Sequence, residues 1–319
     1  MKIIKIAICS ILTFTLLTNC ADCIKGIGRN DLADVLDAWE KEADPDIAIF
    51  DGINTVIFKG NRIYLDEAVK DHYENAWNDL LLCVKNNKIY GIHSYNYKQS
   101  EYGYTVDIYS IDITTNSFEV LYTDNFGVDE SGGAKYYLSY KSVYYQDGTI
   151  VMCDGLRGVS YSIDTGDAEE FDSADFSMPK KEYSIETVFG EAEEIEIHGN
   201  RSDISGEPID HKAIKIVAES EERVITVDYM AQRHPYVKEL VNMGVFRNPL
   251  GEVDPLERFF CASDVYVINE KIYLVCRVLD YDGESSGLIF SYDFETDQFT
   301  YIDYVFSIDV PELVIMPAE

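Results

Sequence analysis

Basic residues are few in this sequence, and their shortage limits what the protein can bind. The 319 residues include 26 lysines and arginines but 58 aspartates and glutamates, which gives a formal net charge of −32 at pH 7. Nucleic-acid binding requires a basic face, and electrostatic attraction to an anionic bilayer requires basic clusters, so the charge argues against both. The acidic excess is expected to keep the protein soluble outside the cell; alternatively, it attracts cationic partners or divalent cations.

Sequence motifs of known catalytic and metal centres are also missing. The five histidines show no His-x-x-x-His spacing, and no cysteine spacing resembles a zinc site. There is no Gly-x-Ser-x-Gly nucleophile elbow and no Walker loop. Carboxylates are so numerous that no acid–base pair can be singled out, so we predict no catalytic residue. The cysteines in or beside apolar runs are expected to be buried thiols that pack as small apolar residues. These are Cys83, Cys153, Cys261 and Cys276.

Proline is scarce, at 8 residues, whereas tyrosine and phenylalanine number 24 and 15. This balance favours β structure with packed aromatic layers. All-β folds of this length are often a single domain, and a repeated pattern along the chain strengthens that expectation.

The repeated pattern is Tyr-Ser-x-Asp, at the end of a β-prone run and before a turn. It occurs at Tyr109–Asp112 and Tyr161–Asp164, and with exchanged aromatics at Phe290–Asp293. A carboxylate at a strand end can accept backbone N–H groups two residues on, and so fix a chain reversal. We therefore predict structural turns at three aspartates. They are Asp112, Asp164 and Asp293.

Units of about 40–50 residues, each with four short strands, are typical of β-propeller blades. The chain resembles bacterial exported β-propeller repeat lipoproteins of unknown function. The resemblance lies in two repeated elements, Ile-Tyr-x-hydrophobic and aromatic-Ser-x-Asp-x-x-Thr-x-x-Phe. The resemblance covers most of residues 47–305. We predict an all-β propeller of about five four-stranded blades, alternatively six, with an N-terminal helix and one inserted helix. The alternative interpretation is that the repeats are ordinary hairpins of a β-sandwich.

One copy also shows a partial similarity to the Asp box of sialidase-type propellers, Ser-x-Asp-x-Gly-x-x-Trp. Residues 162–166 supply the Ser, the Asp and the Gly, but no Trp follows. In that family the box is a structural turn remote from the active site, so the similarity implies blades rather than hydrolysis.

The N-terminus predicts export. Residues 1–19 read as a signal peptide, with Lys2 and Lys5 before an apolar run that is short for a membrane span. Leu17-Thr18-Asn19-Cys20 resembles a bacterial lipobox, which implies lipidation of Cys20, although Asn19 departs from the usual small residue. Simple secretion and an uncleaved anchor are the alternatives. Residues 20–45 are predicted to be a tether and a short helix over 31–43, and residues 46–319 the propeller domain.

Residues 228–257 break the strand pattern and predict a helix that begins at Pro235 and ends near Gly244. We expect this insertion to shape a ligand site, because aromatic rings stack on sugars and Arg grips carboxylates. The alternative is that the helix packs against a blade and buries its apolar face of Val237, Leu240 and Val241. The candidate ligand-binding residues are Arg233, Tyr236, Phe246 and Arg247.

Two further predictions concern the C-terminal part. The run Leu313–Met316 is a candidate strand that pairs with the incomplete first blade. Alternating acidic residues near Gly283 have the chemistry of a calcium loop, or are simply an acidic hairpin tip. The calcium candidates are Asp280, Asp282 and Glu284. No other cofactor is expected.

Together these features predict an extracytoplasmic, lipid-anchored propeller that acts as a ligand-binding or protein-interaction module without catalysis. It would lie on the outer face of a bacterial membrane or the cell surface, or be secreted, and its partner would be a glycan or an envelope protein. The alternatives are a glycan-active hydrolase or lyase and a purely structural envelope protein. The fold alone does not decide among them.

Overall fold

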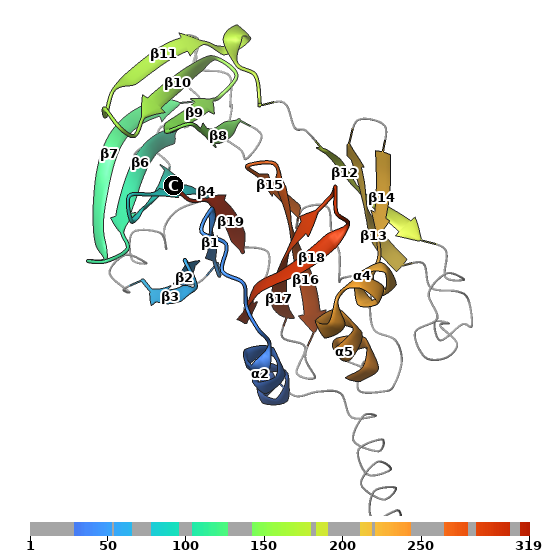
Figure 1. The fold of residues 1–319 in the computed structure, drawn as a ribbon. Coiled ribbons are helices and arrows are strands. Elements are labelled where there is room, and N and C mark those ends of the chain that lie inside the picture. Colours follow the sequence, from blue (N-terminus) through green and yellow to red (C-terminus); the bar gives the residue numbers. More distant parts are fainter. Residues whose placement is uncertain are drawn as a thin grey trace, which may run out of the picture. The chain divides into compact units, whose positions relative to one another are not determined.

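The computed structural model describes residues 29–52, 54–65, 78–95, 104–126, 142–179, 183–190, 211–218, 221–243, 265–279, 285–306 and 313–319. These residues are mostly in β-strands, which form five antiparallel sheets (Figure 1). The chain divides into two compact units. Unit 1 comprises Met1–Ala43 and Glu182–Leu313, and unit 2 comprises Asp44–Lys181 and Val314–Glu319.

Unit 2 contains three four-stranded sheets. The first has the strand order β19-β1-β2-β3, with β1 at Ile47–Phe50, β2 at Thr55–Phe58, β3 at Asn61–Tyr64 and β19 at Val314–Pro317. The second is formed by β4 (Asn78–Lys85), β5 (Lys88–Tyr95), β6 (Tyr104–Asp112) and β7 (Ser117–Phe126). The third is formed by β8 (Val143–Gln146), β9 (Thr149–Cys153), β10 (Arg157–Ser162) and β11 (Ala168–Asp172), followed by the 3-10 helix η1 (Ser173–Asp175).

Unit 1 contains two sheets and three helices. The three-stranded sheet comprises β12 (Tyr183–Gly190), β13 (His211–Ala218) and β14 (Glu221–Ile225). The four-stranded sheet comprises β15 (Val265–Ile268), β16 (Lys271–Leu279), β17 (Ser285–Asp293) and β18 (Gln298–Phe306). The helices are α2 (Arg29–Ala38), α4 (Val227–Arg233) and α5 (Pro235–Met243).

The first sheet of unit 2 joins segments from opposite ends of the sequence. Strand β19 pairs antiparallel with β1, and Ala48 lies opposite Met316. Both side chains are buried. This pairing confirms the strand predicted at Leu313–Met316 and its partner.

The aromatic residue of each Tyr-Ser-x-Asp copy points into the core. Tyr109 and Phe290 are fully buried, and Tyr161 nearly so. Opposite an aromatic residue, a glycine leaves room for the ring: a Cβ on Gly158 would lie 2.0 Å from Phe171. Pairing between glycine and an aromatic side chain thus packs the strands of the repeat closely.

Two of the three repeated aspartates bind the backbone of their own turn. Oδ1 of Asp112 accepts hydrogen bonds from the N–H groups of Thr114 and Thr115, at 2.8 and 2.9 Å. Oδ1 of Asp293 does the same for Glu295 and Thr296, both at 2.9 Å. These bonds hold the pKa of each aspartate below its ordinary value.

Asp164 is used differently from its two counterparts. Its carboxylate binds Nζ of Lys85 on β4 at 2.9 Å. The turn itself is closed by Gly166, whose N–H donates to the carbonyl of Ser162 at 2.9 Å and whose φ is 75°. A glycine adopts this left-handed conformation at no steric cost, so the turn has no need of the carboxylate.

Local differences from the sequence predictions lie mainly in unit 1. The N-terminal helix is shorter than the predicted 31–43 and ends at Ala38. The sheet of β12, β13 and β14 has three described strands instead of the four predicted for each blade, and residues 191–210, between β12 and β13, lie outside the described residues. Helix α4 was not predicted; Thr226 caps it, with Oγ1 accepting from the N–H of Tyr229 at 3.0 Å.

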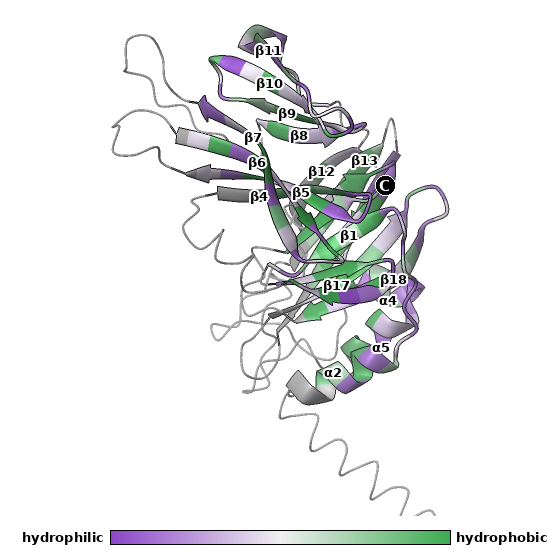
Figure 2. Cartoon of the chain, turned by 90° about the vertical axis from the view of Figure 1, so that its left-hand side faces the viewer, coloured by the Kyte–Doolittle hydropathy of each residue, from purple (hydrophilic) through white to green (hydrophobic). Residues whose placement is uncertain are grey.

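The helices of unit 1 are amphipathic and pack on its sheets. Figure 2 shows hydrophobic and hydrophilic residues side by side on α5. Val237, Leu240 and Val241 are buried in one cluster with Leu32 and Leu36 of α2 and with residues of β13, β16 and β17. Cys83 and Cys153 are buried free thiols, as predicted. None of the described helices is long and apolar enough to cross a membrane.

Candidate functional site

The inserted segment of unit 1 supplies two of the four predicted ligand-binding residues, Arg233 and Tyr236. Pro235 begins α5 directly after α4, so these two side chains are three positions apart at the corner between the helices. Phe246 and Arg247 lie outside the described residues. The structure therefore brings together half of the predicted set.

Tyr236 contacts the N-terminal segment. Its ring stacks on the indole of Trp39, with 4.5 Å between centroids and 6° between planes. Its hydroxyl accepts a hydrogen bond from the N–H of Glu40 at 2.8 Å. Trp39 also donates from Nε1 to Glu239 on α5 at 3.0 Å and meets Tyr301 of β18 edge-on. Tyr236 thus helps to dock residues 29–43 onto unit 1, and its ring face is already occupied.

Arg233 is exposed and forms part of a charged cluster with the turn between β17 and β18. Its Nε lies 2.8 Å from Oδ2 of Asp297, its Nη1 donates to the carbonyl of Tyr229, and its guanidinium lies 3.5 Å above the Tyr229 ring. Asp297 also accepts hydrogen bonds from the hydroxyls of Tyr229 and Tyr292. Nη2 of Arg233 has no hydrogen-bond partner among the described residues.

Burial and hydrogen bonding set the ionisation of this cluster. Burial raises the pKa of Asp297, but the hydrogen bonds from Tyr229, Arg233 and Tyr292 outweigh it, and the pKa lies below its ordinary value. Burial and the same carboxylate raise the pKa of both tyrosines. Asp297 is therefore a fixed anion at neutral pH, and the two phenols are neutral donors.

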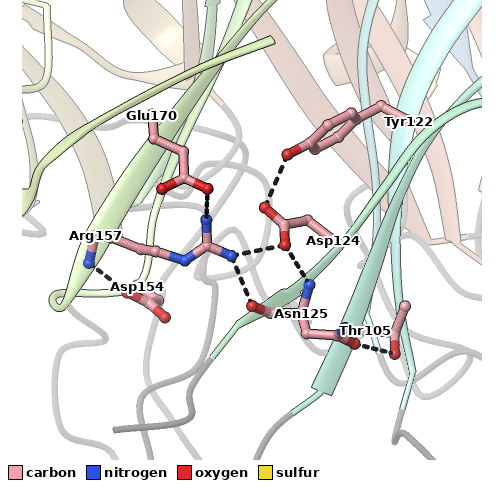
Figure 3. Close-up of polar contacts among 7 residues, drawn as sticks. All are labelled: Thr105, Tyr122, Asp124, Asn125, Asp154, Arg157 and Glu170. Atoms are coloured by element: carbon pink, nitrogen blue, oxygen red, sulfur yellow. Dashed lines mark hydrogen bonds and ion pairs between the residues drawn. The ribbon is translucent and has the colours of Figure 1, made fainter. Parts of the chain in front are cut away.

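A second charged cluster, in unit 2, surrounds Arg157 at the start of β10 (Figure 3). The Nη2 atom lies 2.7 Å from Oδ1 of Asp124 on β7 and donates to the carbonyl of Asn125 at 2.8 Å. The Nη1 atom lies 2.9 Å from Oε1 of Glu170 on β11. Asp154 accepts the backbone N–H of Arg157 at 3.0 Å. The guanidinium thus links two sheets of unit 2 and is enclosed by acidic and carbonyl oxygens.

The pKa shifts in this cluster also favour fixed charges. Burial opposes ionisation of Asp124, but the hydrogen bonds from Arg157 and Tyr122 prevail and lower its pKa. Burial and the bond to Asp124 raise the pKa of Tyr122 to about 12. A proton donor or acceptor needs a pKa near the working pH, so this arrangement suits orientation and binding better than proton transfer. No sequence pattern signals this cluster, because its carboxylates are among the 58 acidic residues of the chain.

The predicted lipidation site and the predicted calcium site lie outside the described residues. Their residues are Cys20 and the calcium candidates Asp280, Asp282 and Glu284. Within the described ranges, no group of three His, Cys, Asp or Glu side chains is arranged to hold a metal ion.

No protein-family model matches the chain, and no curated protein matches it in sequence. Among solved structures, it is similar to a GH62 hydrolase in complex with xylotriose, with 11% identity, 73% of this chain and 70% of that chain covered, and a TM-score of 0.27. It is also similar to the alpha-L-arabinofuranosidase from Podospora anserina in complex with cellotriose. The identity is 9%, the match covers 72% of this chain and 68% of that chain, and the TM-score is 0.24. A third similar structure is that of the tricorn protease. The identity is 11%, the match covers 77% of this chain and 27% of that chain, and the TM-score is 0.22. Similarities this low carry no argument about function.

Proposed function

We propose that the chain is an exported five-bladed β-propeller that acts as a ligand-binding or protein-interaction module without catalysis of its own. The five antiparallel sheets formed by the described residues support five blades. The pairing of β19 with β1 supports a propeller further, since one sheet built from both ends of the domain is a way to close a ring of blades.

The direction of the carboxyl pKa shifts among the described residues agrees with a role without catalysis. Each described carboxyl group with a resolved shift has a lowered pKa. The general acid of a glycosidase is a carboxyl group with a raised pKa. The four shifted groups are thus suited to fixed charge and hydrogen bonding. They are Asp112, Asp124, Asp293 and Asp297.

We place the ligand surface on the inserted segment of unit 1. Arg233 is exposed there, and Phe246 and Arg247 follow the end of α5 in the sequence. Tyr236 would support this surface from behind, because its ring is stacked on Trp39. A guanidinium and an aromatic ring suit a ligand with carboxylates or sugar rings.

We further propose that Cys20 carries lipid and holds unit 1 near the membrane. Cys20 precedes Arg29, the first residue of α2, by nine positions. Nine residues span at most about 30 Å when extended, at about 3.4 Å each. Because the segment after α2 is fastened to unit 1 through Trp39, the anchor would restrain that unit directly.

The test of the binding role is a screen of the purified chain for both binding and turnover of glycans and polysaccharides. Saturable binding that weakens about tenfold or more in Arg233→Ala, but not in Lys238→Ala, is the expected outcome. Lys238 is the matched control because it is an exposed cation on the neighbouring helix α5. Specific turnover that is lost on mutating one carboxylate would instead establish the alternative, a glycan-active hydrolase or lyase.

The test of the anchor is Cys20→Ser. The variant should appear in the medium while the wild-type chain stays with the membrane fraction. Equal partitioning of the two would show that Cys20 is not the anchor.

A further inference from the structure

His234 lies at the corner between α4 and α5 and is buried. It caps the C-terminus of α4, and its N–H donates to the carbonyl of Met230 at 2.7 Å. The residue is 9% exposed, and its Nδ1 atom has no hydrogen-bond partner among the described residues. The imidazole meets the ring of Tyr236 at 5.1 Å and the ring of Phe290 at 5.2 Å, both edge-on. A neutral imidazole is thus packed as an aromatic side chain.

The N-terminal clasp, residues 29–43, reaches the same aromatic ring from the other side. Trp39 stacks on Tyr236, and the N–H of Glu40 donates to the Tyr236 hydroxyl. Tyr236 therefore contacts both His234 and the clasp. A change that displaces this ring acts on both of them.

Charged groups near His234 are already bound to other partners. The guanidinium of Arg233, on α4, is held by Asp297, and the carboxylate of Glu239, on α5, accepts from Trp39. Burial alone lowers the pKa of His234, with no charge that offsets it. The elements around it carry further titratable and charged residues. These are Asp228, Tyr229 and Arg233 on α4, Tyr236, Lys238 and Glu239 on α5, Tyr292 and Asp293 on β17, Glu295 and Asp297 in the turn after it, Tyr301, Asp303 and Tyr304 on β18, and, from the clasp, Asp34, Asp37, Glu40, Lys41 and Glu42.

We propose that His234 is a proton-sensitive latch, and that its protonation in mild acid releases the N-terminal clasp from unit 1. An imidazolium in this apolar packing would lack both water and an acceptor for Nδ1, which is costly. Releasing Tyr236 and the clasp exposes the imidazole to water and removes the cost. The proposal does not rest on the proposed binding function.

The direction of the pH dependence follows from the two states. In the docked state the imidazole stays neutral, and once exposed it regains its ordinary pKa of about 6.5. Docking is therefore insensitive to pH above about 7 and weakens as pH falls below 6.5, until the lowered pKa of the docked form is reached. Between pH 7.5 and 5.5 this linkage raises the equilibrium constant for release by up to about tenfold, the limit reached if the docked imidazole stays neutral throughout that range.

Hydrogen exchange with mass spectrometry on the purified chain measures this constant. After correction for intrinsic exchange, the amides of residues 29–43 should lose protection between pH 7.5 and 5.5, by up to about tenfold. Protection of β17 and β18 should not change, which separates release of the clasp from global unfolding. The fluorescence of Trp39 in a Trp77→Phe background gives a second readout, because the sequence has only these two tryptophans.

Substitutions decide whether His234 is responsible. His234→Phe keeps an aromatic ring but cannot take a proton, so the loss of protection in acid should disappear. His234→Gln, also neutral over this range, serves if the Phe variant does not fold. His93→Gln, on β5 in unit 2, is the matched control and should keep the wild-type response. The proposal is overturned if either His234 variant keeps the wild-type loss of protection in acid, or if the wild-type clasp shows no loss.

Discussion

The indole of Trp39 lies parallel to the phenol ring of Tyr236, 4.5 Å away, although the two residues are nearly two hundred positions apart in the sequence. Trp39 is 6% exposed and belongs to the main hydrophobic cluster of unit 1. The N-terminal segment is therefore part of the core of unit 1 rather than a loose spacer. The helix α2 and the residues that follow it are thus docked on unit 1.

Trp39→Ala should accordingly destabilise unit 1. Loss of a buried aromatic side chain costs about 3–5 kcal/mol of unfolding free energy. Trp39→Phe keeps a ring and should cost less, although it loses the hydrogen bond from Nε1 to Glu239. Urea denaturation followed by circular dichroism measures the unfolding free energy of both variants. Tyr64→Ala, at a side chain that is 68% exposed, is the control and should be nearly neutral. A Trp39→Ala midpoint equal to that of this control would contradict the docking.

Gly158 tests the glycine–aromatic pairing of the repeat. A Cβ at this position would collide with the Phe171 ring, so Gly158→Ala should destabilise unit 2 by about 1–3 kcal/mol. In a Phe171→Ala background the collision is gone, and the added methyl group should be nearly neutral. A double-mutant cycle from thermal unfolding gives the coupling between the two positions. Coupling near zero would show that the strand avoids the clash without cost.

Features set by neighbouring residues could be predicted from the sequence, whereas features set by distant ones could not. The turns at Asp112 and Asp293 depend on backbone N–H groups that lie two and three residues after each aspartate. A short sequence pattern therefore includes all the groups that form the turn. Helix α4 was missed because Val224, Ile225 and Val227 form a β-branched run, and only Thr226 signals a cap. In this stretch tertiary packing outweighs local propensity.

The Arg157 cluster shows the same limit for a site. Its members come from β7, β10 and β11 and from the turn before β10, so they meet only through the pairing of β10 with β11 and the contact between two sheets. In a chain with 58 acidic residues, no pattern distinguishes Asp124 or Glu170 from the others. The partners of Arg233 and Tyr236 are equally distant in sequence, at Asp297 and Trp39.

Asp293→Ala removes the acceptor of two turn hydrogen bonds. We expect a loss of about 1 kcal/mol at neutral pH, as for a typical net hydrogen bond. Asp293→Asn keeps an acceptor oxygen and should lie closer to the wild-type chain. Because the pKa of Asp293 is lowered in the fold, its contribution is present above its ordinary pKa of 3.8 and is lost as pH falls through the lowered value. Wild type and Asp293→Ala should thus converge in stability in strong acid; a difference independent of pH would contradict this.

Arg157→Ala should loosen the link between the second and third sheets of unit 2. Hydrogen bonds to charged groups contribute about 1.5–3 kcal/mol, and Asp124 would lose its cation while it remains mostly buried. The pKa of Asp124 should then rise, since burial would be opposed by Tyr122 and the Asn125 N–H but no longer by Arg157. NMR titration of the carboxyl carbon measures that shift. Lys88→Ala, which removes an exposed ion pair with Glu119, is the control and should leave Asp124 unchanged.

Strand β19 should be required for the stability of unit 2. Met316 is 1% exposed and Ile315 is 3% exposed, and the backbone of β19 forms the outer ladder of the first sheet. Met316→Ala should cost about 2–5 kcal/mol, and removal of residues 314–319 should cost more, because the ladder with β1 and the bonds of Glu319 to Lys85 and Tyr145 go with it. Differential scanning calorimetry measures both as a lowered melting temperature. If the truncated chain melts at the wild-type temperature, β19 is an ordinary tail, and the support that its pairing gives to a ring of blades is lost.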